Sequence, residues 1–398
     1  MSSAHHHPLE VAHVITRFIR GGAQENTLLT VQGLAAEPGY RAWLITGPGL
    51  GPEGDFIPEA RDAGVDVIVV DSLRREINPR LDVAAYRELR RLFGELEPDI
   101  VHTHSSKAGI VGRKAAKDQH VPHVVHTIHG LPFHDYERAW RNWLYTTLER
   151  RAAAYTDLLI SVADAMTAKA VAAGVAPREK FVTIYSGMDV APFLDGGHDG
   201  AAVRRELGID PNAPVIGVVA RISPLKGHEF VIRAAPGILA RYPHARFLFV
   251  GDGHIRDEME QLAESLGVRS AIVFAGLRDY REIPELIASM DLVVHASLRE
   301  GLARVLPQAL LSGVPVVSYD VDGAREVVVN GETGWLVEPE SVDGLEAAVL
   351  EALGDLGRAR EMAEVGREVC RRRFPAPVMV EAIVGQYRRL LEGDRRET

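Results

Sequence analysis

The sequence predicts an α/β protein built from two Rossmann-like domains, each with a doubly wound parallel sheet. The chain has 398 residues, a length that suits two domains of ordinary size. Short runs rich in valine and isoleucine alternate with longer amphipathic stretches, which is typical of parallel strands connected by helices. The alternation stops in a glycine- and proline-rich segment at residues 191–214 and then starts again. We therefore expect an N-terminal domain at 1–190 and a C-terminal domain at 191–375.

The first domain is expected to contain strands separated by helices. Its apolar runs lie at residues 11–16, 41–46, 66–70, 100–102 and 123–127. Helical spacing of apolar residues marks the stretches 25–35, 83–96 and 140–154. This order predicts successive βαβ units in one parallel sheet.

The second domain repeats the same order of elements. Its apolar runs lie at residues 215–219, 246–250, 271–274, 292–295 and 316–318. A last helical stretch, within 376–398, is expected to cross back onto the first domain. Ligands of such sheets bind at the carboxyl ends of the strands, so two facing sheets would enclose one deep cleft.

Composition limits the possible partners and locations. The formal net charge of −10 makes nucleic acid an unsuitable main partner, because a phosphate backbone is held by clustered basic residues. Cys370 is the single cysteine, so a disulfide framework is excluded and a reducing compartment is expected. No apolar run approaches the roughly 20 residues that span a bilayer, and the first residues lack the pattern of a signal peptide. We expect a cytoplasmic protein, either soluble or peripheral on the inner face of the membrane.

Gly21 and Gly22 follow the first expected strand and open a helix. Backbone N–H groups at such a position can approach an anion or a sugar closely. A tight structural turn explains the two glycines equally well, because neither the dinucleotide-binding nor the phosphate-loop pattern is present.

Arg221 and Lys226 lie between the first strand of the second domain and the helix that follows it. Two cations at this place suit a diphosphate, since Arg binds phosphate oxygens bidentately and Lys acts as a mobile point charge. Both would stabilise the charge of a leaving diphosphate. The alternative is an ordinary pair of solvated side chains.

The stretch 297–310 predicts a second anion site. Pro307 is tolerated only in a first helical turn, so we expect the helix to begin near residues 303–306. Its N–H groups, following Gly301, Leu302 and Ala303, would face the ligand. Glu300, just ahead of them, can accept hydrogen bonds from sugar hydroxyls, or it can simply favour the helix dipole.

In this order and spacing, these residues resemble the retaining glycosyltransferases of family 4, which have the GT-B architecture. The resemblance covers nearly the whole chain and rests on Gly21-Gly22, His129-Gly130, Arg221, Lys226, Gly251-Asp252-Gly253, Gly276 to Asp279, and Glu300-Gly301. It implies that the second domain binds a nucleotide diphosphate sugar, with its phosphates on Arg221 and Lys226. It also implies that Glu300 holds the transferred sugar and that His129 lies near that sugar's reactive face.

The chain departs from the family pattern at two positions. Gln308 stands where the family has a second glutamate that binds the ribose hydroxyls, and an amide can still pair with such hydroxyls. Arg304 stands where the family more often has an apolar residue; it would contact a further phosphate or an acidic sugar, or pair with a carboxylate. The expected catalytic residues are His129, Glu300, Arg221 and Lys226. The expected donor-binding residues are Gly21, Gly22, Arg221, Lys226, Gly276, Glu300, Gly301, Leu302, Ala303, Arg304 and Gln308.

No metal or other cofactor is expected, because the two cations and the helix start can neutralise a diphosphate. The first of two signals for a metal is Asp320-Val321-Asp322, in which Asp322 is better explained as the N-cap of a following helix. The second signal is a set of histidines without a carboxylate or cysteine at ligand spacing. This set contains His102, His104, His123, His126, His129 and His134.

The segment 74–91 reads as a basic amphipathic helix. Arg87, Arg90 and Arg91 would dock an anionic membrane that presents a lipid-linked acceptor. The alternative is a surface helix whose apolar face packs on its own sheet, which we favour for the apolar face.

We expect transfer of a sugar with retention from a nucleotide diphosphate sugar, through an oxocarbenium-like transition state. The acceptor is undefined by the sequence; lipid-linked sugars and polysaccharide precursors fit the resemblance. Two alternatives remain open. A non-catalytic sugar-nucleotide-binding protein would show no turnover, and a GT-B epimerase would isomerise the donor without a second substrate.

Overall fold

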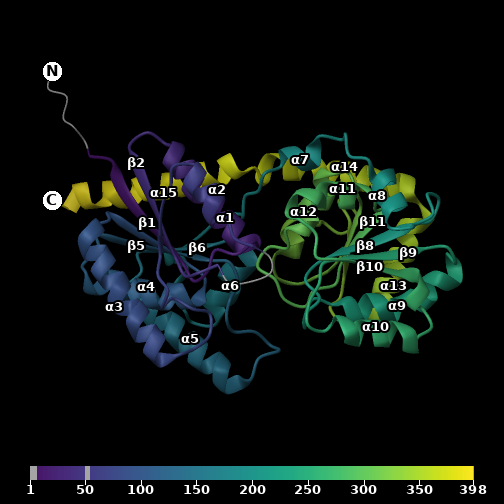
Figure 1. Ribbon diagram of the computed structural model, residues 1–398, viewed down its shortest axis with the longest axis horizontal. Coiled ribbons are helices and arrows are strands. Elements are labelled where there is room, and N and C mark those ends of the chain that lie inside the picture. Colours follow the sequence, from purple (N-terminus) through teal and green to yellow (C-terminus); the bar gives the residue numbers. More distant parts are fainter. Residues whose placement is uncertain (1–6, 50–53, 398) are drawn as a thin grey trace. The chain divides into compact units, whose positions relative to one another are not determined.

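The computed structural model describes residues 7–49 and 54–397. The chain divides into two compact units (Figure 1). Unit 1 is formed by Met1–Met188 together with Pro375–Thr398, and unit 2 by Asp189–Phe374. Each unit is an α/β unit with one parallel sheet, so the predicted fold class is confirmed.

Unit 1 contains a seven-stranded sheet in the order β3-β2-β1-β4-β5-β6-β7. All neighbouring strands in it are parallel. The order reverses beside β1, which is the mark of a doubly wound sheet. The strands are β1 (Leu9–Ile15), β2 (Tyr40–Thr46), β3 (Asp66–Val69), β4 (Ile100–His104), β5 (His123–Ile128), β6 (Leu158–Ser161) and β7 (Phe181–Thr183).

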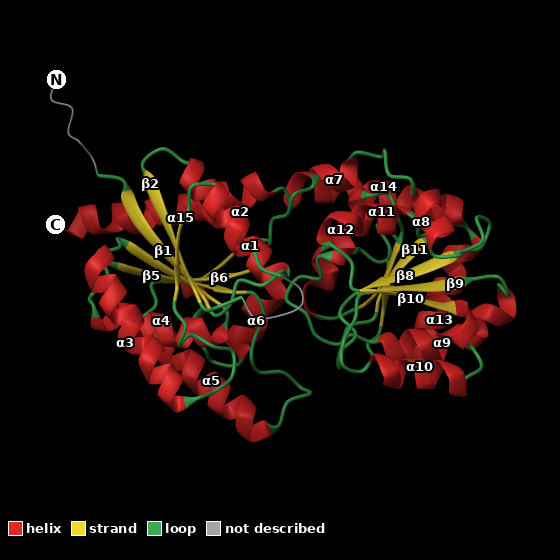
Figure 2. Ribbon diagram, in the orientation of Figure 1, coloured by secondary structure: helices red, strands yellow, loops and turns green. Residues whose placement is uncertain are grey.

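Helices cover both faces of this sheet (Figure 2). One face packs against α1 (Gly22–Ala36), α2 (Ile57–Asp62) and α15 (Ala376–Glu397). The other face packs against α3 (Pro79–Leu96) and α4 (Ser106–Asp118), and α5 (Ala139–Ala153) lies against α4. The helix α6 (Asp164–Ala172) contacts β6 and β7.

Alternation along the strands sorts side chains between these two faces. In β1, Val11 and Ile15 lie in the core under α1 and α15, whereas Ala12 and Val14 lie in the core under α3 and α4. His13 shares the parity of Val11 and is fully buried. The face under α15 therefore carries an imidazole in the centre of the sheet.

Unit 2 contains a six-stranded parallel sheet in the order β10-β9-β8-β11-β12-β13. Its strands are β8 (Val215–Val219), β9 (Arg246–Val250), β10 (Ile272–Gly276), β11 (Leu292–His295), β12 (Val316–Tyr319) and β13 (Trp335–Val337). Its helices are α7 (Ala191–Leu194), α8 (Gly200–Glu206), α9 (His228–Arg241), α10 (Arg256–Ser265), α11 (Ile283–Ala288), α12 (Val305–Leu311), α13 (Val342–Gly354) and α14 (Leu356–Arg373).

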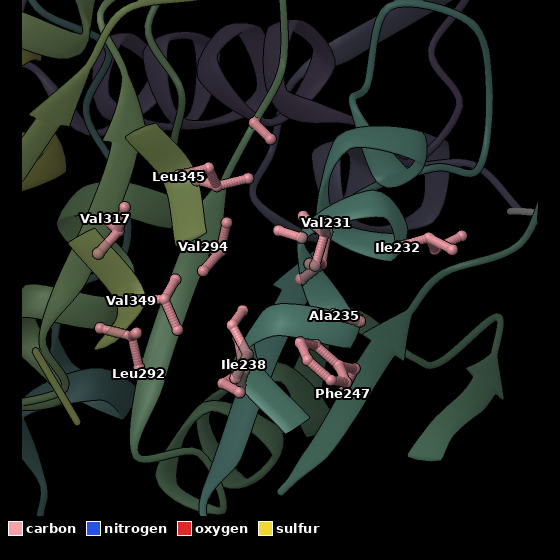
Figure 3. Packing of buried hydrophobic residues seen from close by; sticks show 14 of the residues in the cluster. Val231, Ile232, Ala235, Ile238, Phe247, Leu292, Val294, Val317, Leu345 and Val349 are labelled. Carbon is pink, nitrogen blue, oxygen red and sulfur yellow. The ribbon is translucent and has the colours of Figure 1, made fainter. Parts of the chain in front are cut away.

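The core of unit 2 forms because two helices present apolar stripes to the same sheet face (Figure 3). Val231, Ala235 and Ile238 recur along α9 at helical spacing and are buried. Leu345 and Val349 do the same on α13, and they pack on apolar strand residues. Burial of a side chain of this size is worth roughly 1.5–3 kcal/mol, so this core fixes the strands whose ends carry the site.

Among the described residues, no helix is both long enough and apolar enough to cross a bilayer.

Candidate functional site

The carboxyl ends of four strands of unit 2 bring predicted donor-binding residues, together with Gly251 of the family pattern, to one edge of its sheet. Arg221 follows β8, Gly251 follows β9, Gly276 ends β10 and Glu300 lies between β11 and α12. These strands are neighbours in the order β10-β9-β8-β11, and all of them are parallel. Parallel strands end at the same edge, so the loops after them form one surface, where α/β sheets bind their ligands.

The loop that carries Lys226 is fixed against the segment after β11. Leu298 N donates to Leu225 O at 2.9 Å. Gly227 has φ +76, and a Cβ there would lie 1.8 Å from Ala296 O, so only glycine fits this crossing. Lys226 is thereby placed beside the segment that contains Glu300.

The same loop is fixed on its other side by the turn after β9. Ile222 N donates to Asp252 O at 3.0 Å. A Cβ at Gly253 would lie 2.0 Å from Ile222 O, which again excludes any side chain. The exposed Arg221 thus projects from a backbone that is held on both sides.

Glu300 is the charged centre of this edge. Lys226 Nζ donates to its Oε1 at 2.5 Å, and His295 Nε2 lies 3.6 Å from the same oxygen. Burial tends to raise the pKa of Glu300, but the charge of Lys226 and the contact with His295 outweigh it and hold the pKa well below its usual range. Glu300 is therefore a carboxylate at neutral pH and an acceptor for hydroxyl groups. Lys226, predicted to bind phosphate, here contacts Glu300.

His295 is a residue of this site that the sequence reasoning missed. It ends β11, is 4% exposed, and its Nδ1 lies 3.0 Å from Ser318 Oγ on β12. Ser318 Oγ also donates to Tyr319 O at 2.8 Å, and Nε2 of His295 faces Glu300. A histidine that ends a predicted strand five residues before Glu300 was the available signal.

The helix α12 begins at Val305, within the predicted range, and Pro307 lies in its first turn. Gly301, Leu302 and Ala303 are buried ahead of it. Arg304 and Gln308 are partly exposed on its first turns, and the Gln308 N–H donates to Arg304 O at 3.1 Å. The predicted residues of 300–308 are therefore adjacent, and it is the side chain of Gln308, rather than its backbone, that is available to a ligand.

The prediction for Asp322 was wrong. The short helix it was meant to cap is a 3-10 helix, Asp322–Glu326, that includes it. Asp322 has φ +46, and its Oδ2 accepts from Glu300 N at 2.7 Å. Asp320 pairs with Arg325. The two aspartates therefore have separate partners: Asp322 positions the backbone of Glu300, and neither forms a metal site with the other.

In unit 1, His129 follows β5 and ends a chain of three hydrogen-bonded imidazoles. His13 Nδ1 lies 2.9 Å from His104 Nε2, and His104 Nδ1 lies 3.0 Å from His129 Nε2. His129 is partly exposed, whereas His13 and His104 are fully buried. His129 also borders a pocket at the carboxyl ends of β4 and β5, lined by Ser105, Ser106, His126, Thr127, Ile128, His129, Gly130, Leu131, Pro132, Glu149 and Val175.

The buried rings are neutral. Burial lowers the pKa of His13 to about 3. Burial, followed by the neighbouring histidines, also holds the pKa of His102 and His104 well below the usual value. On the opposite face of the sheet, burial and the charge of Arg113 lower the pKa of His126.

His13, His102 and His104 form a group of three that could hold a metal, with ligand atoms within 4.8 Å of one another. In this structure five of the six ring nitrogens of these residues have hydrogen-bond partners among the described residues, and His13 Nε2 is the exception. His102 contacts Tyr387 Oη at 2.5 Å and Thr127 Oγ1 at 2.7 Å, and both nitrogens of His104 belong to the imidazole chain. The arrangement therefore fits a hydrogen-bond network better than a coordination site.

Gly21 and Gly22 belong to unit 1, whereas the other predicted donor-binding residues belong to unit 2. Gly21 is extended, with φ 174, and α1 begins at Gly22. Glu25 N donates to Gly21 O at 2.8 Å, which is the first bond of the helix. The structure thus supplies the helix start that the sequence predicted.

The helix α3 begins at Pro79, so Arg74 and Arg75 precede it. Its Ala85, Leu89, Leu92 and Phe93 are buried on the sheet, in agreement with a packed apolar face, whereas Val83 is exposed. Arg87, Arg90 and Arg91 are exposed. Arg91 pairs with Glu95 at 2.6 Å, and Arg90 Nε donates to Gln119 Oε1 at 3.2 Å.

Two family models match the chain, one in each unit. Residues 200–369 match the glycosyl transferases group 1, and residues 21–187 match the glycosyl transferase 4-like domain. A curated Escherichia coli relative, a UDP-Gal:alpha-D-GlcNAc-diphosphoundecaprenol alpha-1,3-galactosyltransferase, is 29% identical over 353 residues, which are 88% of this chain and 89% of that protein.

Solved structures share the fold. Anabaena HepE in complex with UDP-glucose superposes with a TM-score of 0.80 at 23% identity, over 95% of this chain and 99% of that one. Sucrose-phosphate synthase from Thermosynechococcus elongatus gives a TM-score of 0.84 at 21% identity, over 97% and 100% of the chains. The chain is therefore a glycosyltransferase of the family 4 type with the GT-B fold, and its unit 2 matches the glycosyl transferases of group 1.

Proposed function

We propose that this glycosyltransferase moves a sugar with retention from a nucleotide diphosphate sugar, bound by unit 2, to an acceptor. The observation that carries the proposal is the Glu300 carboxylate, held charged by Lys226 and His295 at the carboxyl edge of the sheet. A charged carboxylate beside a cation suits a sugar hydroxyl on one side and a phosphate on the other.

The proposed diphosphate site is the loop 220–227. Arg221 is exposed on it, and Lys226 Nζ is already at the edge of the site through Glu300. When the bond between the anomeric carbon and the phosphate breaks, the leaving diphosphate gains negative charge, which these cations would stabilise without a metal. Gln308 would contact the ribose, and Glu300 the hydroxyls of the transferred sugar.

A uridine diphosphate sugar is the donor class that the comparisons support. The Escherichia coli relative is named for UDP-Gal, and the Anabaena structure contains UDP-glucose. We therefore propose UDP-hexoses as first donors, and a lipid-linked sugar as acceptor because that relative is named for one. His129 would contribute an imidazole to the transferred sugar.

A turnover assay with UDP-galactose and UDP-glucose tests this proposal. The nucleotide released and the anomer of the sugar first formed are measured by proton NMR, with GDP-, ADP- and CMP-sugars as comparisons. Release of UDP with an α-configured sugar is the expected result. A β-configured product would refute retention, binding without turnover would favour a non-catalytic binding protein, and an isomerised donor would favour an epimerase. Glu300→Gln, which keeps the shape of the side chain, serves as the matched control.

The proposed membrane contact is tested separately. Arg87, Arg90 and Arg91 project from one helix, and each basic residue near an anionic surface contributes about 1 kcal/mol. We expect the triple Ala variant to lose most of its binding to phosphatidylglycerol vesicles at low salt. Unchanged binding at the same ionic strength would rule out this surface, and neutral vesicles serve as the control.

A further inference from the structure

The three imidazoles of unit 1 meet because of strand parity and strand order. His13 pairs in register with His102 across β1 and β4, and Ile15 pairs with His104. His104 in turn pairs with Thr127 of β5, two residues before His129. His13, His104 and His129 therefore descend across three neighbouring strands on the face under α15, each within hydrogen-bond distance of the next.

The proton positions in this chain follow from its inner end. A neutral imidazole has one N–H and one bare nitrogen. His13 Nε2 is buried, and none of the described residues forms a hydrogen bond with it. A buried N–H without an acceptor is rarer in proteins than a buried acceptor without a donor. The proton of His13 is therefore on Nδ1, where it is donated to His104 Nε2.

The proton positions of His104 and His129 then follow in turn. His104 accepts at Nε2, so its own proton is on Nδ1 and is donated to His129 Nε2. His129 accepts at Nε2, so its proton is on Nδ1. We propose that His13 and His104 are positioning residues that hold His129 as the Nδ1–H tautomer, so that Nδ1, and not Nε2, is the nitrogen of this ring that can donate a hydrogen bond.

The surroundings of His13 and His104 keep these two rings neutral. His102 stacks on His104 at 4.3 Å between ring centroids and is itself held by Tyr387 and Thr127. On the opposite face of the sheet, Arg113, beside His126, pairs with Glu149 at 2.6 Å. No carboxylate of the described residues bonds to His13, His102 or His104.

This differs from the usual catalytic histidine, whose inner nitrogen donates to a carboxylate. A carboxylate stabilises the imidazolium and so prepares the ring to act as a base. Here the inner partner of His129 is a neutral ring that donates to it, so Nδ1 is the nitrogen of His129 that carries the proton. The tautomer is independent of the proposed function; only its role toward a sugar rests on that proposal.

The direct test is the tautomer itself. Protein labelled with ¹⁵N-histidine is observed by long-range proton–nitrogen correlation, and the His129 signals are assigned by their loss in His129→Gln. We expect His129 to carry its proton on Nδ1. We also expect His104→Phe, which keeps a buried ring but removes the donor to His129, to return His129 toward the Nε2–H form that predominates in free histidine. Nε2–H in the unmodified protein, or no change in a folded His104→Phe variant, would overturn the proposal.

Kinetics supply a second readout, together with a matched control. His104→Phe should lower kcat by roughly ten- to hundredfold, the scale found for residues that orient an active-site histidine, with donor KM changed less than about twofold. His104→Gln should restore much of kcat, because an amide can accept at one atom and donate at the other. His102→Phe removes a ring of the same stack that lies outside the chain, and it should leave the His129 tautomer unchanged.

Two outcomes separate this inference from the proposed function. If the protein transfers no sugar from any donor while His129 is found as Nδ1–H, the positioning role stands and the proposed function fails. If transfer proceeds and a folded His104→Phe variant retains the kcat of the unmodified protein, the proposed function stands and the positioning role is wrong.

Discussion

Acidification from pH 7.5 to 5.5 should destabilise unit 1 far more than unit 2. Four fully or almost fully buried histidines of unit 1 have a lowered pKa, because burial disfavours their charged form: His13, His102, His104 and His126. In unit 2, burial lowers the pKa of the buried His228 to about 4.

The sign and size follow from linkage. The unfolded chain takes up a proton on each histidine as pH falls through its ordinary value of about 6.5, whereas the folded chain does not. Stability from each ring is therefore present above pH 6.5 and is lost below it, by about 1.4 kcal/mol between pH 7.5 and 5.5. Four rings give about 5 kcal/mol for unit 1 and one ring about 1.4 kcal/mol for unit 2. A domain has roughly 5–15 kcal/mol in total, so unit 1 should come close to unfolding.

Hydrogen exchange read by mass spectrometry during urea titration resolves the two units. Peptides from β1 and β4 report unit 1, and peptides from β8 and β9 report unit 2. The pH range of 7.5 to 5.5 lies above the range in which carboxylates such as Glu300 titrate in the unfolded chain, so the histidines dominate the change in stability. His13→Phe should reduce the pH dependence of unit 1 by about a quarter, and His228→Phe should affect unit 2 alone. Equal pH dependence in the two units would refute the burial argument.

Three further expectations concern turnover. Arg221→Ala and Lys226→Ala should each slow sugar transfer by about two to three orders of magnitude, the effect of removing one preorganised charge-stabilising group; near-normal steady-state rates in both would remove them from the diphosphate site. Glu300→Ala should lower kcat more than donor affinity, whereas Gln308→Ala should weaken donor binding by about 1 kcal/mol and leave kcat intact; titration calorimetry with UDP separates the two effects. Dialysis against EDTA should leave activity unchanged, and complete loss that Mg²⁺ restores would contradict a metal-independent reaction.

The fold was predictable because buried parallel strands have a simple sequence pattern. The runs at 246–250 and 292–295 match β9 and β11 at both ends. The strands β7 and β13 were not predicted, since each is three residues long and too short to show a period. Their place is set by the neighbouring strand with which each one pairs, information that a short window of sequence lacks.

The edge of unit 2 was predictable in outline and not in its contacts. Arg221, Lys226 and Glu300 could be placed at strand ends from the sequence. The pairing of Lys226 with Glu300, 74 residues later, depends on the backbone bond between Leu225 and Leu298, which fixes one loop on the other. Asp322 was misjudged because its left-handed backbone conformation, φ +46, lets the side chain reach Glu300 N instead of the helix that follows.

The imidazole chain shows where inference from sequence stops. His102 and His104 are two residues apart in a predicted strand, so their common face could be inferred from the alternation. A doubly wound order places β1 beside β4, which would have added His13 to that face. The proton positions could not be inferred in this way. They depend on His13 Nε2, which has no hydrogen-bond partner among the described residues, and this is a property of the packed interior rather than of any one segment.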